Sequence, residues 1–409
     1  MDLSFLLSIK KCIKRNKYMK RYIIFALSLC TASLAFAQSD LQVILKQIEA
    51  NNPEIQANQK LMEAQVWDTK SSNNLDNPTV SYAHVWDSKN KSETESELEI
   101  TQGFEFPTAY IHRNKVNKRK IKALEATFLS QRQNILLQAK EVCLDLIMLH
   151  QQKTILDQRL NYADKLYEAY QKMLEAGDAT SIEVNKIKLE KLNIQTESTI
   201  NASELKKKEA ELVTLNGNKP ISILHSEYPS IDLPDYNLIK DEAFDSSFDI
   251  QYARSEYEAA VKQIAVNKAG WFPHLELGYK RNSGTGHHAN GLVVGFSIPL
   301  FNNRGKVSSA KANAISKAFS EDLVKNKLQS EIYQSYEEAK AMKEQIDSYE
   351  KTLDIEGALS LLEKALQGGE LSMTAYFVEI ATVYQSAQNL IQIQNMYQKQ
   401  IAKLYKHRL

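Results

Sequence analysis

The sequence predicts a mainly helical protein with a small β part, built as a tandem repeat. Each half is expected to hold one helix, two short strands and two long helices. Three observations lead to this prediction. Gly and Pro are scarce, at 13 and 8 of 409 residues, which is typical of long uninterrupted helices. Long stretches lack proline altogether, and short landmarks recur in the same order in both halves at nearly constant spacing.

Residues 1–37 are predicted to be a secretory signal peptide. Seven basic residues precede an apolar run from Ile23 to Leu34, and Ala35-Phe36-Ala37 forms an A-x-A cleavage site. The apolar run is too short to cross a bilayer as a helix. We therefore expect the mature chain to begin at Gln38. Met19 is the expected translation start, because Met19 to Ala37 is by itself a complete signal.

Charge and cysteine content exclude several classes of protein. With 51 basic and 50 acidic residues, the chain has no excess of positive charge to bind nucleic acid. Cys12 and Cys30 lie in the predicted signal peptide, so Cys143 has no intramolecular disulfide partner in the exported chain. Its neighbours Val142 and Leu144 indicate a buried helix position. Cys30 could accept a lipid, but the bulky Leu29 before it disfavours a lipoprotein.

The two halves of the exported chain repeat each other. At an offset of 195, Asn52-Pro53-Glu54-Ile55-Gln56 corresponds to Ser247-Phe248-Asp249-Ile250-Gln251, and Asn77-Pro78 to Phe272-Pro273. At an offset of 192, Gly103-Phe104-Glu105-Phe106-Pro107 corresponds to Gly295-Phe296-Ser297-Ile298-Pro299, and Gly177-Asp178 to Gly369-Glu370. We therefore predict repeat 1 at residues 38–216, a linker at 217–235 and repeat 2 at 236–409.

Each half is expected to contain two long helices joined by a tight reversal. No glycine or proline occurs from Thr108 to Ala176, so these residues could form one helix of roughly 100 Å. Apolar residues follow two interleaved rows along it, which is typical of a coiled-coil seam. Gly177 and Gly369 mark the reversals, because glycine adopts left-handed conformations freely. The acids after them, Asp178 and Glu370, would also suit the start of the following helix.

Two strands are expected between the helices of each half, bounded by prolines at Pro78, Pro107, Pro273 and Pro299. Apolar residues occupy alternate positions, with Gln102 as an exception: Val80, Tyr82, His84 and Trp86; Leu98, Ile100, Phe104 and Phe106; Leu275, Leu277 and Tyr279; Leu292, Val294, Phe296, Ile298 and Leu300. The hairpin tips, 88–96 and 282–290, are polar. Each strand has about 8 to 10 residues, close to the length of a tilted transmembrane strand. Hairpins packed on the helices of a soluble protein are the alternative.

A membrane-spanning interpretation of these strands requires several copies of the chain. Unpaired backbone groups cost several kcal/mol each in hydrocarbon, so no strand edge can stay open there. Four strands cannot close a barrel, and eight strands from a dimer would enclose only their own side chains. Twelve strands, from a trimer, are the smallest multiple of four that leaves a lumen. The interpretation therefore predicts a homotrimer.

No motif points to catalysis, a cofactor or a bound metal. The sequence has no Walker glycine loop, G-x-S-x-G elbow or H-E-x-x-H motif, so we predict that the protein is not an enzyme. His287-His288 is the only tight histidine pair. Adjacent side chains diverge on an extended segment and no third ligand follows at useful spacing, so no metal site is expected. Met173 and Met373 near the reversals are expected to pack.

Over residues 38–409 the chain resembles the TolC-like outer-membrane efflux proteins, also called outer-membrane factors. The resemblance rests on the Asn-Asn-Pro-Glu entry, the proline-bounded hairpins, their tandem order, and the tips Gly177-Asp178-Ala179-Thr180-Ser181-Ile182-Glu183-Val184 and Gly369-Glu370-Leu371-Ser372-Met373-Thr374. It implies a trimeric α/β-barrel with four transmembrane strands per protomer. The strands would lie in the outer membrane of a Gram-negative bacterium, and the helices would project into the periplasm.

The resemblance also implies partners and a cargo. A periplasmic adaptor, served by an inner-membrane pump, would dock at the helix tips that contain Gly177, Asp178, Gly369 and Glu370. Trp271-Phe272-Pro273-His274-Leu275 and the Gly-Glu-Leu-Ser tip resemble the heavy-metal cation efflux branch. The expected function is a passive exit duct for metal ions or small toxic compounds. A soluble periplasmic coiled-coil adaptor or scaffold, and the outer-membrane exit of a protein-secretion system, are the alternatives.

Overall fold

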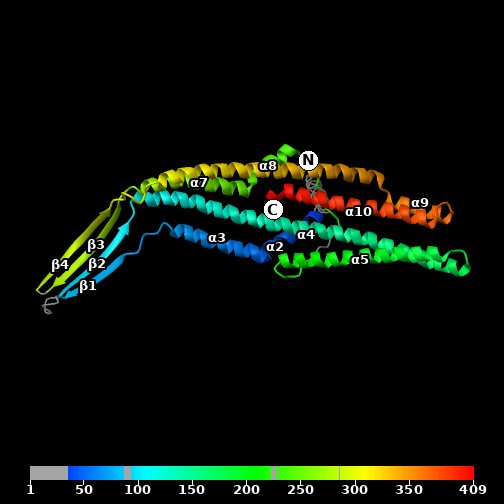
Figure 1. Cartoon of the computed structure of the whole chain (residues 1–409), viewed down its shortest axis with the longest axis horizontal. Coiled ribbons are helices and arrows are strands. Elements are labelled where there is room, and N and C mark those ends of the chain that lie inside the picture. Colours follow the sequence, from blue (N-terminus) through cyan, green and yellow to red (C-terminus); the bar gives the residue numbers. More distant parts are fainter. Residues whose placement is uncertain (1–35, 87–93, 223–226, 230, 285) are drawn as a thin grey trace, which may run out of the picture. The chain divides into compact units, whose positions relative to one another are not determined.

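The computed structural model describes residues 36–86, 94–222, 227–229, 231–284 and 286–409 (Figure 1). Its elements are α2 (Phe36–Asn51), α3 (Pro53–Ser71), β1 (Thr79–Trp86), β2 (Thr94–Phe104), α4 (Pro107–Ala176), α5 (Ser181–Leu215), α6 (Tyr236–Ser246), α7 (Phe248–Ala269), β3 (His274–Gly284), β4 (His287–Ser297), α8 (Lys306–Thr352), α9 (Ile355–Gln367), α10 (Met373–Leu404) and the short η1 (Lys406–Arg408). Residues 1–35 of the predicted signal peptide, and parts of the predicted linker and hairpin tips, lie outside these ranges.

The predicted fold class, long helices with a small β part, is confirmed. Two details differ from the sequence-based expectation. Each half begins with two shorter helices instead of one, because the chain is interrupted at Asn52 and at Ser247, whose hydroxyl caps α7. In the second half the long helix is also broken between α8 and α9. There the Asp354 carboxylate accepts a hydrogen bond from the Gly357 N–H at 3.0 Å and starts a new helix.

The four strands form one antiparallel sheet in the order β1-β2-β3-β4. The strands of the two halves therefore pair with each other through β2 and β3. The register places Val80, Ile100, Tyr279 and Leu292 in one row across the sheet, on the same face. Within the described chain, β1 and β4 each have a neighbour on one side only.

The chain forms two compact units, and each draws on both halves of the sequence. The sheet unit contains residues 54–134 and 236–334; the hairpin unit contains the described residues up to Pro53 together with 135–235 and 335–409. Both α4 and α8 contribute residues to the two units. The two compact units do not coincide with the two predicted sequence repeats, and the contacts that define them do not test a duplication. The division into repeats therefore stays a prediction.

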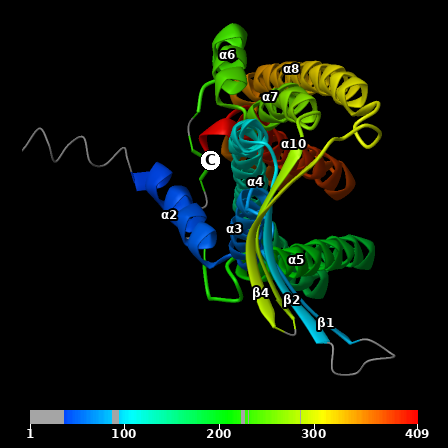
Figure 2. The same ribbon diagram turned by 90° about the vertical axis from the view of Figure 1, so that its left-hand side faces the viewer.

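In the sheet unit, polar contacts define a row of helices in the order α3, α4, α7, α8. Asn117 of α4 donates to the Thr69 carbonyl of α3 at 2.7 Å. Arg119 of α4 pairs with Glu258 of α7 at 2.9 Å. From α7, Asn267 donates to the carbonyl of Lys306 on α8 at 2.9 Å. Figures 1 and 2 both show α7 beside α8. The row therefore ends in α3 on one side and α8 on the other.

In the hairpin unit, α4, α5 and α10 pack around an apolar core whose largest fully buried members include Leu144, Leu146, Ile187, Leu212, Tyr376 and Ile401. Asp145 of α4 ties the three helices together, since its carboxylate lies 3.3 Å from the Lys208 ammonium of α5 and 2.5 Å from the Lys399 ammonium of α10. Of the described helices, none combines the length and apolar character needed to cross a membrane.

Cys143 lies in this core with no exposed surface, and burial raises the pKa of its thiol to about 12. Because only the thiolate reacts with disulfide reagents, Cys143 in the chain from Gln38 onward should not react with Ellman's reagent at pH 8 until guanidinium unfolds the protein. Ser309→Cys, at an exposed position of α8, provides the reactive control. Native Cys143 reacting as fast as this control would contradict the packing of α4.

Candidate functional site

One face of the sheet carries exposed apolar residues over the half nearer the helices, and polar residues such as Arg281 and Asn290 follow towards the hairpin tips. Leu292, Val294 and Phe296 of β4 are 86%, 73% and 69% exposed, and Val80 and Tyr82 of β1 are exposed to a similar degree. The polar exception Gln102 donates its amide to the Asp76 carbonyl at 2.7 Å. No helix of the sheet unit covers this face. Apolar surface of this extent gains free energy when it leaves water, so the face requires a partner outside the single chain.

The opposite face of the sheet is polar and open. The register places on it Glu95, Glu97, Glu99, Glu276 and Lys280, together with Gly103, Gly278, Gly284, Gly291 and Gly295. The Lys280 ammonium lies 2.5 Å from the Glu97 carboxylate. A Cβ added at Gly103 or Gly291 would meet no atom within 4 Å. The face is therefore open at these two positions, and its carboxylates outnumber its one lysine.

The four predicted boundary prolines all lie at the ends of elements. Pro78 immediately precedes β1, and Pro273 immediately precedes β3. Pro107 is the first residue of α4, where its missing N–H costs no helical hydrogen bond. Pro299 lies two residues beyond the end of β4.

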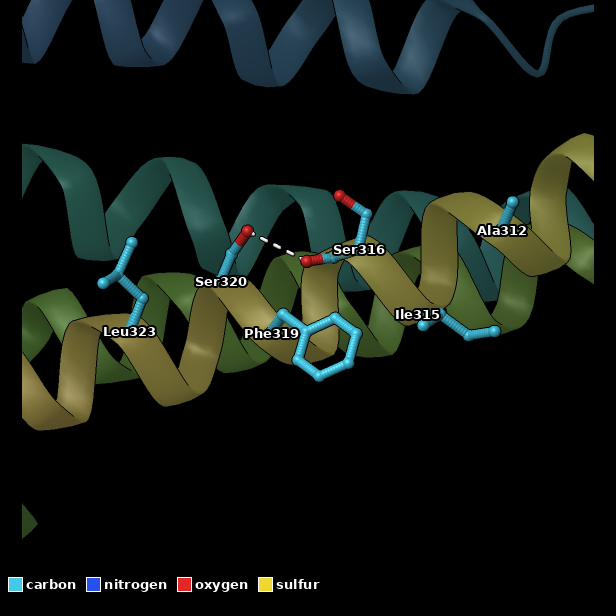
Figure 3. A pocket seen from close by; sticks show the side chains of 6 residues that line it. All are labelled: Ala312, Ile315, Ser316, Phe319, Ser320 and Leu323. Carbon is cyan, nitrogen blue, oxygen red and sulfur yellow. Dashed lines mark hydrogen bonds between the residues drawn. The ribbon is translucent and has the colours of Figure 1, made fainter.

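The two ends of the helix row in the sheet unit carry exposed apolar stripes. On α8, Ile315, Phe319 and Leu323 are 59%, 70% and 68% exposed and alternate with the small residues Ala312, Ser316 and Ser320, so that they line a shallow groove (Figure 3). On α3, at the other end of the row, the exposed residues Ala57, Leu61, Ala64 and Trp67 follow helical spacing. Both stripes are therefore exposed apolar surface within the sheet unit.

The predicted reversals lie at the tips of the α4–α5 and α9–α10 hairpins. Gly177 and Gly369 have φ values of +83° and +74°, which only glycine adopts without strain. The Asp178 N–H donates to the Met173 carbonyl at 2.8 Å, and the Glu370 N–H to the Ala365 carbonyl at 2.9 Å, so both helices end in the same hydrogen-bonded turn.

Asp178 and Glu370 lie outside the helices, two residues before the N-caps Thr180 and Ser372. Both are exposed, and neither carboxylate forms an ion pair in the described part of the chain. The acidic residue in the first turn of α5 is instead Glu183. It forms a capping box with Thr180, whose N–H and hydroxyl hold the pKa of Glu183 below its usual value.

The two predicted tips lie in the same unit and are connected just behind their turns. The Lys186 ammonium of α5 donates to the Thr374 hydroxyl of α10, and the Tyr376 hydroxyl of α10 donates to the Tyr162 oxygen of α4. These cross-links involve residues that the sequence analysis did not single out. A Lys or Thr one or two turns from a helix end carries no signal of its own in a polar sequence.

A buried ion pair in the hairpin unit was also missed. Arg159 of α4 is 8% exposed, and its guanidinium lies 2.7 Å from Glu197 and 3.2 Å from Glu190, both on α5. It also lies over the ring of Tyr384 on α10, at 5.0 Å from the centroid. Arg159 follows a polar stretch of α4, so nothing in the sequence distinguishes it from a solvated residue.

The described residues contain no group of three or more His, Cys, Asp or Glu side chains that could hold a metal ion. His288 instead contacts the Ser283 hydroxyl, with 2.5 Å between Nδ1 and Oγ. The surfaces found are therefore an apolar sheet face, a polar sheet face, two apolar helix stripes and a pair of helix tips.

Comparison with known structures identifies the fold. VceC, an outer membrane protein of Vibrio cholerae, is 17% identical, with a TM-score of 0.73 over 90% of this chain and 96% of its own. CmeC, an outer membrane channel of Campylobacter jejuni, is 15% identical, with a TM-score of 0.69 over 90% and 85%. CusC, studied for transmembrane channel formation, is 15% identical, with a TM-score of 0.70 over 90% and 92%.

No curated protein sequence matches the chain significantly. A family model does match: residues 239–407 correspond to the model described as outer membrane efflux protein. This segment begins in α6 and ends in η1, so it includes β3, β4 and the α9–α10 hairpin. Residues 239–407 are thus similar to the outer membrane efflux proteins, and the fold of the chain is that of the outer-membrane channels, as the sequence resemblance predicts.

Proposed function

We propose that the protein is the outer-membrane exit duct of a tripartite efflux system. It passively conducts metal ions or small toxic compounds that an inner-membrane pump and a periplasmic adaptor deliver. The observation that carries this proposal is the sheet with one exposed apolar face and one open polar face. Lipid would cover the apolar face, while the polar face would line a water-filled passage. The helices then lie on the periplasmic side.

Closure of this passage requires a homotrimer. Strands β1 and β4 are the two edges of the sheet, and α3 and α8 are the two ends of the helix row in the same unit. An edge that stays open in hydrocarbon leaves its backbone groups unpaired, so β4 of one copy must pair with β1 of the next. The stripes on α8 and α3 would meet at the same seam. Three copies give twelve strands and leave a lumen.

The helix tips are the proposed docking site of the adaptor. Gly177 and Gly369 shape the turns, and the exposed carboxylates of Asp178 and Glu370 have no ion-pair partner in the described part of the chain. They can therefore pair with cationic groups of another protein. The sequence contains no Walker loop or catalytic motif, so in this proposal the pump supplies the transport energy and the protein acts as a passive duct.

The charge of the polar sheet face favours positively charged cargo. Glu95, Glu97, Glu99 and Glu276 face a single lysine, and three copies would triple this excess of negative charge. Cations would be concentrated and anions repelled, which agrees with the resemblance to the heavy-metal branch. The exposed apolar sheet face disfavours a soluble adaptor or scaffold, because that face would meet water. No particular observation favours a protein-secretion exit.

Deleting the gene tests the function and the cargo together. We expect the deletion strain to become more sensitive to at least one of zinc, cobalt, copper, cationic dyes or detergents, and the wild-type gene to restore resistance. The measurement is the minimal inhibitory concentration of each compound. The protein should also fractionate with the outer membrane as a heat-modifiable trimer. Unchanged sensitivity to every compound, together with quantitative release by osmotic shock, would contradict the proposal.

Phe319→Glu should weaken the trimer, because it places a carboxylate in the apolar stripe of α8 where another copy would pack. Asn313→Glu adds the same charge at an exposed position outside the groove and is the matched control. In size-exclusion chromatography with light scattering in detergent, Phe319→Glu should shift at least half of the protein to smaller species. Equal trimer content in the two variants would remove α8 from the proposed seam.

Gly177→Val combined with Gly369→Val should reduce efflux to the level of the deletion strain while trimer content in the membrane stays unchanged. A β-branched residue is strained at positive φ, so both turns must rearrange. Gly286→Val is the control, since Gly286 also has positive φ with nothing within 4 Å but lies between β3 and β4. Normal resistance in the Gly177/Gly369 variant would contradict docking at the tips.

A further inference from the structure

Two connections between helices and strands form an exposed apolar ledge in the sheet unit. Residues 270–273 join α7 to β3, and residues 298–305 join β4 to α8. On the first, Trp271 and Phe272 are 49% and 47% exposed; on the second, Leu300 and Phe301 are 66% and 86% exposed. These side chains continue the apolar face of the sheet past the ends of its strands.

Polar contacts hold the two connections together. Asn303, which is 6% exposed, donates its side-chain amide to the Gly270 carbonyl, and a Cβ at Gly270 would lie 3.1 Å from the Asn303 amide nitrogen. Asn267 donates to the Lys306 carbonyl at 2.9 Å. The ring of Phe272 also stacks on Phe106, with centroids 4.7 Å apart. The ledge is therefore a fixed platform and not two independent loops.

Three cations flank this ledge on the side of the helices: Lys268, Arg304 and Lys306, hereafter the junction cluster. All three are exposed, and none forms an ion pair in the described part of the chain. Some other exposed cations of the sheet unit are paired, such as Lys60 with Glu63 and Lys327 with Glu331. The junction cluster thus carries positive charge that nothing in its own chain neutralises.

The electrostatics of α8 add to this charge. The helix begins at Lys306 and has no acidic residue in its first turn. The N-terminus of a helix carries partial positive charge, so cations there are unfavourable unless an anion is close. On α4, which also begins at this junction, the exposed Lys115, Lys118 and Lys122 follow helical spacing without an ion pair. The start of α8 therefore favours an external anion, and the lysines of α4 add further unpaired positive charge.

We propose that the junction cluster binds the phosphate groups of anionic phospholipids at the membrane surface where the apolar sheet face ends. The proposal rests on the membrane location of the sheet given under the proposed function. Aromatic side chains at the edge of an apolar band, followed by Lys and Arg, are the pattern expected at the boundary between acyl chains and headgroups. Phosphate then supplies the counter-charge that the chain itself lacks.

The test uses the purified full-length trimer in neutral detergent and the triple variant K268Q/R304Q/K306Q. The control K60Q/K207Q/K327Q removes the same charge from three exposed lysines that pair with carboxylates within their own helices. Thermal unfolding midpoints are measured with added phosphatidylglycerol and with phosphatidylcholine. Phosphatidylglycerol should raise the midpoint of the wild type and of the control, and this increase should fall by at least half in the junction triple.

An equal effect of phosphatidylglycerol on all three proteins, or no effect on the wild type, would overturn the proposal. The same shift with inorganic phosphate alone would identify a free-anion site and would also overturn it. If the triple fails to fold, native mass spectrometry of the wild type and of Arg304→Gln decides by the number of bound phosphatidylglycerol molecules, which should be lower in the variant. A stable membrane trimer without this lipid preference would leave the proposed function intact.

Discussion

The exposed apolar face of the β1–β4 sheet is the constraint from which the rest of the account follows. Its side chains need an apolar environment, while the backbone groups at its two edges need hydrogen-bond partners. Lipid can satisfy the first requirement but not the second. A copy of the same chain satisfies the second, because β4 and α8 form one edge of the sheet unit and β1 and α3 the other. The proposed function therefore makes membrane insertion and assembly one linked event.

The sequence predicted the features that depend on local chemistry. Alternation in stretches such as 292–300 identified the strands, because side chains of a strand point to opposite faces. The absence of Gly and Pro identified α4 as one long helix, and Gly177 and Gly369 identified its reversal and that of the second half. Each of these signals lies within a few residues of the feature it predicts.

Features that depend on contacts between distant segments could not be predicted. The break before α9 rests on the Asp354 cap, and an Asp in a polar helix resembles any solvated residue. Arg159 meets its partners on α5 and α10 only after the helices pack. Asn303 and Gly270 are joined although 33 residues separate them. In each case the residue type is common and its importance comes from the three-dimensional position.

Lipid contact of the apolar face can be measured directly by fluorescence quenching. In a variant with Phe at Trp67, Trp86 and Trp271, Leu292→Trp places the only tryptophan on the apolar face, and Val293→Trp places it on the polar face. In vesicles with brominated acyl chains, Leu292→Trp should lose more than half of its emission relative to unbrominated vesicles, while Val293→Trp should be nearly unaffected. Equal emission of Leu292→Trp in both kinds of vesicle would contradict the account.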